Sequence, residues 1–479
     1  MTEGPVILGV DLGTSGIKVV AVSEDGSVVA AARCGYPTSR PEPEAAEQDP
    51  RDWWRALETA GDEIARTVSP GRWRGIGLSA MLPTLVELDA AGAPFGAAIT
   101  WEDARAEQQA TDLRVEFGDE QLYRITGQRV DGRYLAPMHA RLQKLGRAGT
   151  TTAGAKDVLF HQLTGRLLTD PSTAAGSAVF DIERGTWNDE LAAAAGISRL
   201  PDVAPAATAL PLAQPWRQRW GLSGDVPVVL GAADSVLGAL GVGAVGHGDV
   251  GVIAGTSAIV LGISDRPTRD PAQRYLVTPL SGAGWGLEMD LLAMGSAFDA
   301  VAGLFGLDGP AALLEAAGAV AAEEAPLFLP YLTPGEQGAL WDPTLTGTLQ
   351  GLRLGMGVGH IGRALLSGIV VELRRCIDVL AVTTGRSGPV RLGGGSAVSP
   401  LMWQDIADAT GRDVWVDPTV TDHSAIGAAL FAAGALGSPI ARDGVSSVVE
   451  PRAGRYDWWT DCLARHDEAR LRQCGRDGR

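Results

Sequence analysis

The chain has 479 residues, of which 45% are hydrophobic and 20% are charged, and its formal net charge at pH 7 is −17. This length predicts roughly two to four domains, and the composition is typical of a soluble globular protein. Because the chain is acidic and contains no basic block, we expect neither nucleic acid nor a membrane surface as a partner. Four scattered cysteines and the lack of a basic-then-apolar leader predict a cytoplasmic protein.

The first half of the chain mixes predicted strands with predicted helices. A helix is expected to begin at Asp49-Pro50, because Asp is a good N-cap and Pro suits the first helical position. In chain order we predict strands at 6–10, 17–22 and 28–32, a helix at 50–68, strands at 75–79, 84–88 and 98–101, and helices at about 102–116 and 152–163.

A proline-rich connector at 201–227 leads to a second half of the same style. Its predicted elements are strands near 251–263, helices near 290–305, 310–322 and 359–384, a strand at 389–392 and a helix from about 399. The uncharged run 424–441 is rich in Ala and Gly, which favours a closely packed buried helix over a membrane span. A mixed-charge helix at 456–474 is expected on the surface.

These elements predict α/β domains. The expected division is an N-terminal domain at 1–244, a C-terminal domain at 245–440 and a helical tail at 441–479.

One short segment occurs twice. GVDLGTSGI at 9–17 returns as GVIAGTSAI at 251–259, with six of nine positions identical. Glycine lets backbone N–H groups approach an anion, and Thr and Ser add hydroxyl donors. The repeat therefore predicts two related domains, each presenting a phosphate-binding turn to a shared cleft, although ordinary hairpin turns would also contain these residues.

Two acidic residues are placed for catalysis. Asp11 ends the first strand, where a carboxylate could hold Mg²⁺ beside phosphate oxygens or could cap its own turn. Asp234 lies between an apolar strand and a helix, where it could be a general base or a helix N-cap. Lys18 could offer a positive charge to phosphate or could be a solvated strand lysine.

A glycine-rich loop, LGGGS at 392–396, follows a short strand and suits contact with a nucleotide. The chain contains neither a Rossmann G-x-G-x-x-G fingerprint with its acidic partner nor a Walker A motif. It also has no H-E-x-x-H and no G-x-S-x-G, which argues against a zinc hydrolase and a serine esterase.

Taken together, these motifs resemble those of the FGGY carbohydrate kinases, and within them the xylulokinase-like branch, over residues 6–437. The matching segments are DLGTS at 11–15, SRP at 39–41, EQDP-x-x-WW at 47–54, ITWEDAR at 99–105, KD at 156–157, LTG at 163–165, TDPS at 169–172, FLPYL at 328–332, GGG at 393–395 and AIGAA at 425–429.

The resemblance implies a two-domain actin/hexokinase-like (ribonuclease H-like) fold with a central cleft for ATP and a sugar. It implies Asp234 as the catalytic base and Asp11 as the Mg²⁺ ligand. The phosphate-binding residues would be Gly13, Thr14, Ser15, Lys18, Gly255 and Thr256, the adenosine-binding residues Gly394, Gly395 and Ser399, and the substrate-binding residues Met81, Leu82, Trp101, Asp103, Asp234 and Ser235. Family analogy also suggests a homodimer.

Some sugar-pocket positions depart from the xylulokinase pattern. Leu82 replaces a usual His, Ser235 replaces a usual Asn after the base, and Gln337 replaces the Arg of a Gly-Glu-Arg motif. The expected function is transfer of the ATP γ-phosphoryl group to a primary hydroxyl of a ketopentose or related polyol, with D-xylulose first. The alternatives are a gluconate (sugar-acid) kinase and an actin- or chaperone-like ATPase without a sugar acceptor.

Overall fold

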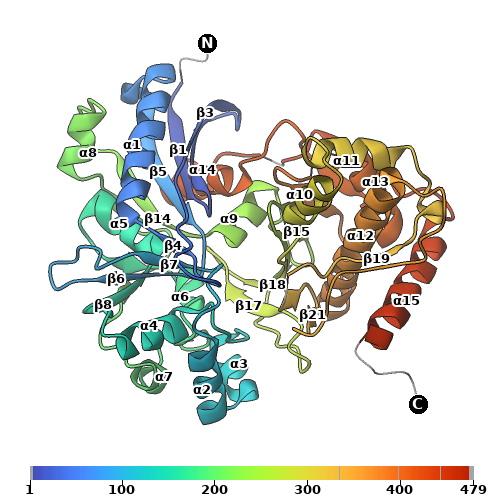
Figure 1. The fold of residues 1–479 in the computed structure, drawn as a ribbon. Coiled ribbons are helices and arrows are strands. Elements are labelled where there is room, and N and C mark those ends of the chain that lie inside the picture. The colour runs from blue at the N-terminus through green and yellow to red at the C-terminus, as the bar shows by residue number, and fades with distance from the viewer. Residues whose placement is uncertain (1–3, 334, 398, 443, 474–479) are drawn as a thin grey trace.

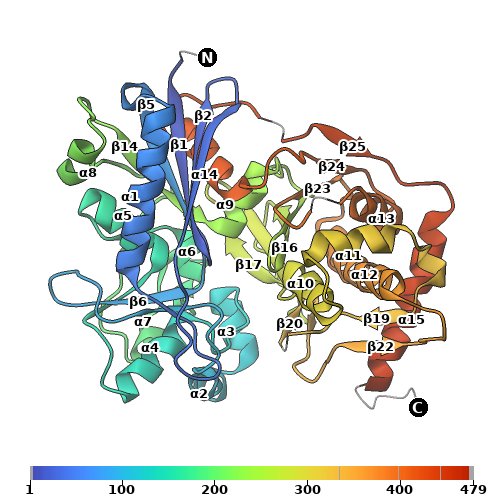
Figure 2. The ribbon, with the colours of Figure 1, turned by 45° about the horizontal axis from the view of Figure 1, so that its top comes forward.

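The protein is described by a computed structural model covering residues 4–333, 335–397, 399–442 and 444–473. Two lobes lie side by side, one formed mainly by the first half of the chain and the other by the second half (Figures 1 and 2). Each lobe is built on a mixed sheet with helices packed against it. The α/β class expected from the sequence is confirmed.

The first lobe contains a six-stranded sheet in the order β13-β14-β5-β1-β2-β3. Its strands are β1 (Val6–Leu12), β2 (Gly16–Ser23), β3 (Val28–Gly35), β5 (Trp73–Ala80), β13 (Ala209–Pro211) and β14 (Pro227–Ala233). The strands β1, β5 and β14 run parallel, so their carboxyl ends meet at one edge of the sheet. Such an edge is where open α/β sheets bind ligands.

Helix α1 (Pro50–Thr67) packs against β2 and β3, and its start is as predicted: the Asp49 side chain accepts a hydrogen bond from the Arg51 amide. A second, four-stranded sheet lies below the first in Figure 1, in the order β4 (Glu47–Gln48), β7 (Ala98–Thr100), β6 (Thr84–Leu88) and β8 (Thr151–Gly154). The other helices of this lobe are α2 (Glu107–Phe117), α3 (Asp119–Thr126), α4 (Leu135–Lys144), α5 (Ala155–Thr164), α6 (Pro171–Ala175), α7 (Asp189–Ala194) and α8 (Gln214–Arg219). Two small ribbons pair β9 (Leu168–Thr169) with β12 (Asp202–Val203) and β10 (Phe180–Asp181) with β11 (Thr186–Trp187).

Two helices of the first lobe begin later than predicted. Residues 102–106 form turns because the Asp103 side chain accepts hydrogen bonds from the Ala46 and Arg105 amides, and α2 starts only at Glu107. The segment predicted as a helix from residue 152 begins as β8, which pairs with β6, and α5 follows from Ala155. In both places contacts distant in sequence override the local helical pattern.

The second lobe contains a nine-stranded sheet whose main path is β21-β20-β18-β16-β15-β23-β24-β25, with β17 paired to β18. Its strands are β15 (Val250–Ala254), β16 (Ala258–Ser264), β17 (Leu276–Pro279), β18 (Trp285–Leu291), β20 (Glu336–Gln337), β21 (Leu340–Trp341), β23 (Val390–Gly393), β24 (Val414–Val416) and β25 (Ser447–Val449). A separate ribbon pairs β19 (Leu327–Leu329) with β22 (Thr348–Gln350).

The helices of the second lobe are α10 (Gly295–Leu304), α11 (Gly309–Gly318), α12 (Val358–Thr384), α13 (Pro400–Thr410) and α15 (Arg455–Gln473). The long helix predicted at 359–384 is confirmed as α12. The helix predicted from residue 290 is wrong at its start, because residues up to Leu291 complete β18, which pairs with β16 on one side and β17 on the other.

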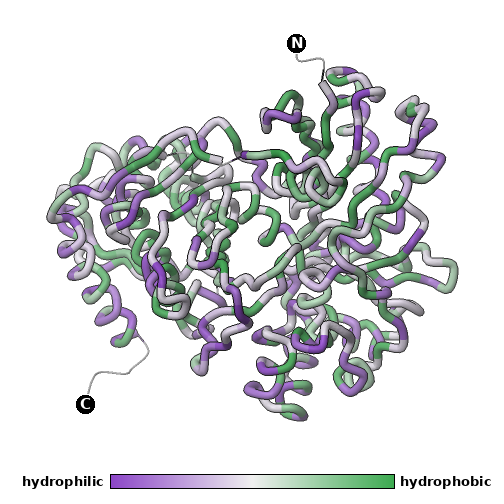
Figure 3. Tube along the Cα trace, turned by 180° about the vertical axis from the view of Figure 1, so that it is seen from behind, coloured by the Kyte–Doolittle hydropathy of each residue, from purple (hydrophilic) through white to green (hydrophobic). Residues whose placement is uncertain are grey.

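The C-terminal helix α15 is not a purely surface element. Many of its residues are hydrophilic (Figure 3). Trp459, Cys462 and His466, however, are buried. Cys474, the end of the predicted helix, lies outside the described residues. Among the described helices no single one is long and apolar enough to cross a membrane; α10 and α11 pass that test only as a pair bent by 83°.

Two helices join the lobes. Helix α9 (Asp234–Gly241) leaves the first sheet and packs on β15 and β16 of the second, whereas α14 (His423–Ala435) follows the second sheet and packs on β1 and β5 of the first. The buried Ala/Gly helix predicted at 424–441 is thus confirmed, although it ends earlier. A Cβ on Gly427 would lie 1.8 Å from the Leu237 carbonyl oxygen, so glycine is required where α14 meets α9.

Candidate active site

The first Gly-Thr-Ser turn connects β1 and β2. The Gly13 amide donates to the Gly16 carbonyl at 3.1 Å, which closes the turn. The indole of Trp101 donates to Thr14 Oγ1 at 2.9 Å, and the side chain of Gln48 donates to the Thr14 carbonyl at 2.7 Å. Ser15 is exposed at the tip. Trp101 and Gln48 therefore support the turn at Thr14, while Ser15 remains exposed to solvent. A phosphate-binding loop requires such an exposed side.

Asp11 lies directly beneath this turn. Its carboxylate is only 3% exposed, accepts a hydrogen bond from Ser79 Oγ at 2.8 Å and lies 3.5 Å from Lys18 Nζ. Antiparallel pairing places Lys18 directly opposite Asp11 on β2. The structure therefore brings together the metal-ligand candidate and the lysine predicted to face phosphate.

The second turn, at residues 255–257, connects β15 and β16 in the same way. The Gly255 amide donates to the Ser257 carbonyl at 2.7 Å, and Thr256 is exposed. Ser396, from the glycine-rich loop after β23, donates through Oγ to the Gly255 carbonyl at 2.9 Å. The second phosphate-turn candidate and the nucleotide-loop candidate are therefore neighbours.

The glycine-rich loop uses its glycines differently. Gly394 has φ of +101°, and a Cβ there would lie 2.3 Å from the Ala254 carbonyl oxygen. Gly395 is exposed, with nothing within 4 Å of its Cβ position. Gly394 is thus required by the backbone conformation of the loop. Gly395 has no neighbouring atom at its Cβ position, so the space beside it is open to a ligand. Ser399 stands at the N-cap position of α13, three residues after Ser396, which contacts the second turn.

Asp234 is the first residue of α9, at the point where β14 ends. Ala233 holds the N-cap position, and the Asp234 carboxylate accepts a hydrogen bond only from the neighbouring Ser235 amide among the described contacts, at 2.9 Å. Burial, followed by the negative charges of Asp11 and Asp290, raises the pKa of Asp234 to about 8. A carboxyl group with such a pKa is a strong proton acceptor when ionised, as a general base near neutral pH must be.

A cavity next to Asp234 is lined by both lobes. Its walls are formed by Leu82, Pro83, Gln128, Arg133, Tyr134, Ser172, Ala175, Gly176, Leu276, Thr278, Glu288, Asp290 and Glu336. Of the substrate-binding residues predicted from the sequence, Leu82 lies in this wall. Ser235 lies behind it and donates through Oγ to Glu288 at 3.0 Å.

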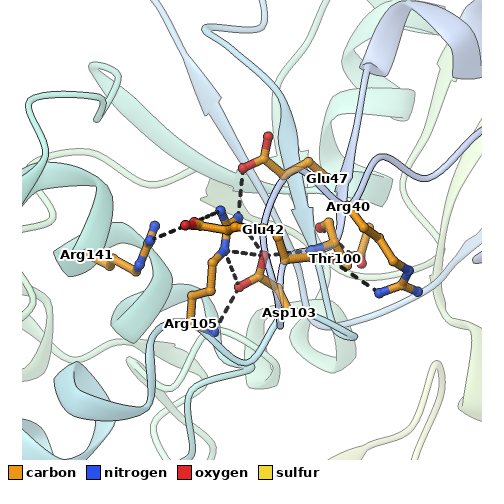
Figure 4. A network of polar contacts seen from close by, with 9 residues as sticks. Arg40, Glu42, Glu47, Thr100, Asp103, Arg105 and Arg141 are labelled. Atoms are coloured by element: carbon orange, nitrogen blue, oxygen red, sulfur yellow. Dashed lines mark hydrogen bonds and ion pairs between the residues drawn. The ribbon is translucent and has the colours of Figure 1, made fainter.

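The other predicted substrate residues lie elsewhere. Met81 is buried in the core of the first lobe, and Trp101 supports Thr14. Asp103 is buried and binds the Arg105 guanidinium at 2.6 Å, and Arg105 also contacts Glu42 and Glu47 (Figure 4). This network ties the segment that precedes α1 to the turn between β7 and α2, which is a structural role that differs from the expected contact with substrate.

Sequence reasoning missed the charged residues of the cavity. Arg133 forms ion pairs with Asp131 at 2.7 Å and, across the lobes, with Glu336 at 3.2 Å. Burial raises the pKa of Glu288 and of Glu336 well above the usual range, and it raises that of Asp290 to about 6, against the opposing charge of Arg133. Arg133 precedes the three acidic residues by more than 150 positions. The one local signal was the alternating pattern of β18, which carries Glu288 and Asp290.

Within the described residues there is no cluster of three or more His, Cys, Asp or Glu side chains arranged to hold a metal ion. Mg²⁺, however, usually takes one or two carboxylates together with phosphate oxygens and water. Asp11 and Asp234 fit that requirement, and Asp11 is close enough for its charge to raise the pKa of Asp234.

Two similar Gly-Thr-Ser turns, one from each lobe, together with the buried Asp11, Asp234 at the end of β14 and a polar cavity lined by both lobes, are the features of a two-lobed phosphotransferase. Residues 6–241 match the model of the N-terminal domain of the FGGY family of carbohydrate kinases, and residues 250–436 match that of its C-terminal domain. The chain belongs to the FGGY family of carbohydrate kinases. It has the family's two-domain actin/hexokinase-like fold and, like the family, is an ATP-dependent phosphotransferase.

The similar proteins act on different substrates. The chain is 30% identical over 429 residues to the xylulose kinase of Escherichia coli (strain K12), covering 85% of both chains. It is 28% identical over 467 residues to the gluconokinase of Bacillus subtilis (strain 168), covering 92% of this chain and 90% of that one. The crystal structure of gluconate kinase from Lactobacillus acidophilus superposes with a TM-score of 0.90 at 25% identity, covering 98% of both chains.

Proposed function

We propose that this kinase transfers the γ-phosphoryl group of ATP to a primary hydroxyl of a neutral ketopentose, with D-xylulose as the expected acceptor. Asp234 acts as the general base and accepts the proton of that hydroxyl. The turns at Gly13 and Gly255 hold the phosphates, and the loop at Gly395 faces the adenosine. Phosphoryl transfer depends mainly on such positioning and on stabilising charge.

The position of Asp234 carries this proposal. Burial raises its pKa most, followed by the charges of Asp11, which lies under the first phosphate turn, and of Asp290, which lines the cavity. Asp234 follows β14, whose carboxyl end lies at the same edge of the sheet as that of β1, which carries Asp11. The neighbouring Ser235 donates to Glu288 in the cavity wall, and both observations support a base that serves phosphate and acceptor. Magnesium, when bound, would neutralise phosphate charge, and Asp11 is the residue that would hold it.

The charges of the cavity favour a neutral acceptor over gluconate. A sugar acid needs a free cation for its carboxylate. Arg133 is the arginine that lines the cavity within the described residues, and its guanidinium already contacts Asp131 and Glu336. The carboxylate of bound gluconate would also approach Glu288 and Asp290. The hydroxyl groups of a neutral sugar can instead donate hydrogen bonds to the carboxylate oxygens of these two residues without adding a negative charge. Gluconate is the alternative acceptor because relatives of both kinds match the chain equally well.

The test is ADP release from Mg-ATP with D-xylulose, D-ribulose, glycerol and gluconate as acceptors, for the wild type and for Asp234→Asn. Release that requires a neutral ketose and is lost in the variant supports the proposal. Preferential release with gluconate would overturn the substrate assignment. Release that needs no acceptor and survives the substitution would instead favour an ATPase.

A further inference from the structure

A buried charged cluster lies behind β14, the strand that leads to Asp234. Its Ser172 also borders the cavity, whereas Lys156 and Asp170 do not line it, and none of the three has a role in the chemistry proposed above. Lys156 on α5 is 1% exposed, and Asp170 and Ser172 are each 0% exposed. Lys156 Nζ lies 3.0 Å from Asp170, and Ser172 donates to the same carboxylate through both its amide and its hydroxyl. Asp157 is a further 3.9 Å neighbour of Lys156.

The cluster contacts β14 at two points just before Asp234. Lys156 Nζ donates to the Leu230 carbonyl at 3.2 Å, and Ser172 Oγ accepts a hydrogen bond from the Ala233 amide at 2.9 Å. Ala233 immediately precedes the proposed base. The two contacts therefore hold both ends of the short segment that leads into Asp234.

That segment is a place where the sheet itself gives little support. The pairing of β14 with β5 changes register between Val229 and Ala232. Gly231 there has φ of +71°, and its Cβ position lies 1.7 Å from the Leu78 carbonyl oxygen. Such irregularities redirect a strand and often lie beside active sites. Here the strand is redirected just before it delivers Asp234, and Lys156 binds the carbonyl inside the irregularity.

The stability of the folded protein does not explain why this buried cluster is charged rather than apolar. Removing a lysine and a carboxylate from water costs free energy that their attraction often only balances, and apolar side chains of similar size would fill the space as well. An apolar cluster, however, could neither bind the Leu230 carbonyl nor accept the Ala233 amide hydrogen. Both backbone groups would then lack these partners at the catalytic end of the strand.

We propose that Lys156, Asp170 and Ser172 are positioning residues that fix the end of β14 and thereby aim the Asp234 carboxylate at the acceptor hydroxyl. Ser172 binds the backbone next to the base, Asp170 orients the Ser172 hydroxyl, and Lys156 compensates the charge of Asp170. The inference rests on the proposed role of Asp234 as the base.

The test compares Ser172→Ala with Ser177→Ala. Ser177 is equally buried on the same segment, donates to the Ala174 carbonyl and accepts from the Val179 amide, but has no contact with β14 among its described bonds. Each variant is assayed for melting temperature, for kcat and KM of both substrates, and for the ratio of ADP released to sugar phosphate formed.

We expect Ser172→Ala to lower kcat by about tenfold to a hundredfold, because a small misplacement of a catalytic group has effects of that size. KM for ATP should stay within about twofold of the wild type, since both phosphate turns are intact. ADP release should exceed sugar phosphate formed. Ser177→Ala should lower the melting temperature without any of these kinetic changes.

Equal kcat and equal coupling in the two variants, at a similar loss of melting temperature, would overturn the inference. If Ser172→Ala does not fold, Ser172→Cys provides a side chain of similar size that is a weaker hydrogen-bond acceptor. If neither variant folds while Ser177→Ala does, Ser172 has a structural role, and that result would also overturn the inference. Asp234→Asn is assayed in parallel. An active Asp234→Asn would refute the proposed function itself, whereas an inactive one beside an unaffected Ser172→Ala would refute only the positioning role.

Discussion

Replacing Asp234 by Asn should stabilise the free protein while abolishing its activity. In the folded protein the pKa of Asp234 is raised from 3.8 to about 8 by burial and by the charges of Asp11 and Asp290. The folded state therefore binds this proton more tightly than the unfolded state does. It follows that the stabilising contribution of the proton is present below pH 4 and is lost as pH rises towards 8.

The size of this effect follows from the shift. One pKa unit corresponds to 1.36 kcal/mol, so between pH 3.8 and pH 7 ionisation of Asp234 would cost the folded state roughly 4 kcal/mol if it were fully shielded from water. Its side chain is half-buried beside a cavity, where solvent screening reduces the cost. We expect Asp234→Asn, which cannot ionise, to be more stable than the wild type by about 2 kcal/mol at pH 7.

The measurement is thermal unfolding of both proteins without nucleotide at pH 5, 6, 7 and 8. The advantage of Asp234→Asn should grow steadily with pH. Asp299→Asn, which changes an exposed carboxylate on α10, is the matched control and should show no such trend. Melting temperatures of wild type and Asp234→Asn that fall in parallel from pH 5 to pH 8 would refute the electrostatic reasoning.

Three further predictions concern the phosphate turns, the nucleotide loop and the cavity. Gly395→Ala should fold normally but raise KM for ATP several-fold. Gly394→Ala should lower the melting temperature strongly, because its Cβ would collide with the backbone. Kinetics and thermal unfolding of the two variants distinguish a contact with the ligand from a requirement of the loop conformation. Trp101→Phe removes the hydrogen bond to Thr14 and should raise KM for ATP about threefold to tenfold with little change in KM for the sugar; an altered sugar KM alone would instead support the substrate contact expected from the sequence. Arg133→Met removes the cation that pairs with Glu336, and it should raise KM for the acceptor by about tenfold or more while KM for ATP is unchanged. An unchanged KM for the acceptor would place this ion pair outside the substrate site.

The sequence predicted those parts of the site that depend on local structure. Both Gly-Thr-Ser turns, the glycine-rich loop and the strand-to-helix position of Asp234 are short segments whose residues determine their own backbone shape. The cavity could not be predicted in this way. Glu288 and Asp290 fell in a segment interpreted partly as helix, and their strand is defined by pairing with β16 and β17, which only the folded chain brings together.

Residues that share a motif with the site can also be supports rather than contacts. Trp101 and Asp103 belong to one matching segment, and both were expected to bind substrate. In the structure one donates to Thr14 and the other anchors Arg105. A motif shows that residues are retained together, but it does not show whether a side chain faces the ligand or the loop that holds the ligand. That distinction depends on where the neighbouring loop lies, which local sequence does not contain.

The crossing of α9 and α14 links Asp234, the proposed base, to any movement of the lobes. Each helix follows the sheet of one lobe and packs on the sheet of the other, and Gly427 allows the two helices to touch through their backbones. A rotation of the lobes about this contact would change the distance between the turns at Gly13 and Gly255. Asp234 is the first residue of α9, three residues before Leu237, whose carbonyl oxygen meets Gly427 of α14. If the residues have the roles proposed above, closure of the lobes on ATP would bring the turns at Gly13 and Gly255 together while Asp234 stays attached to the contact between the two helices.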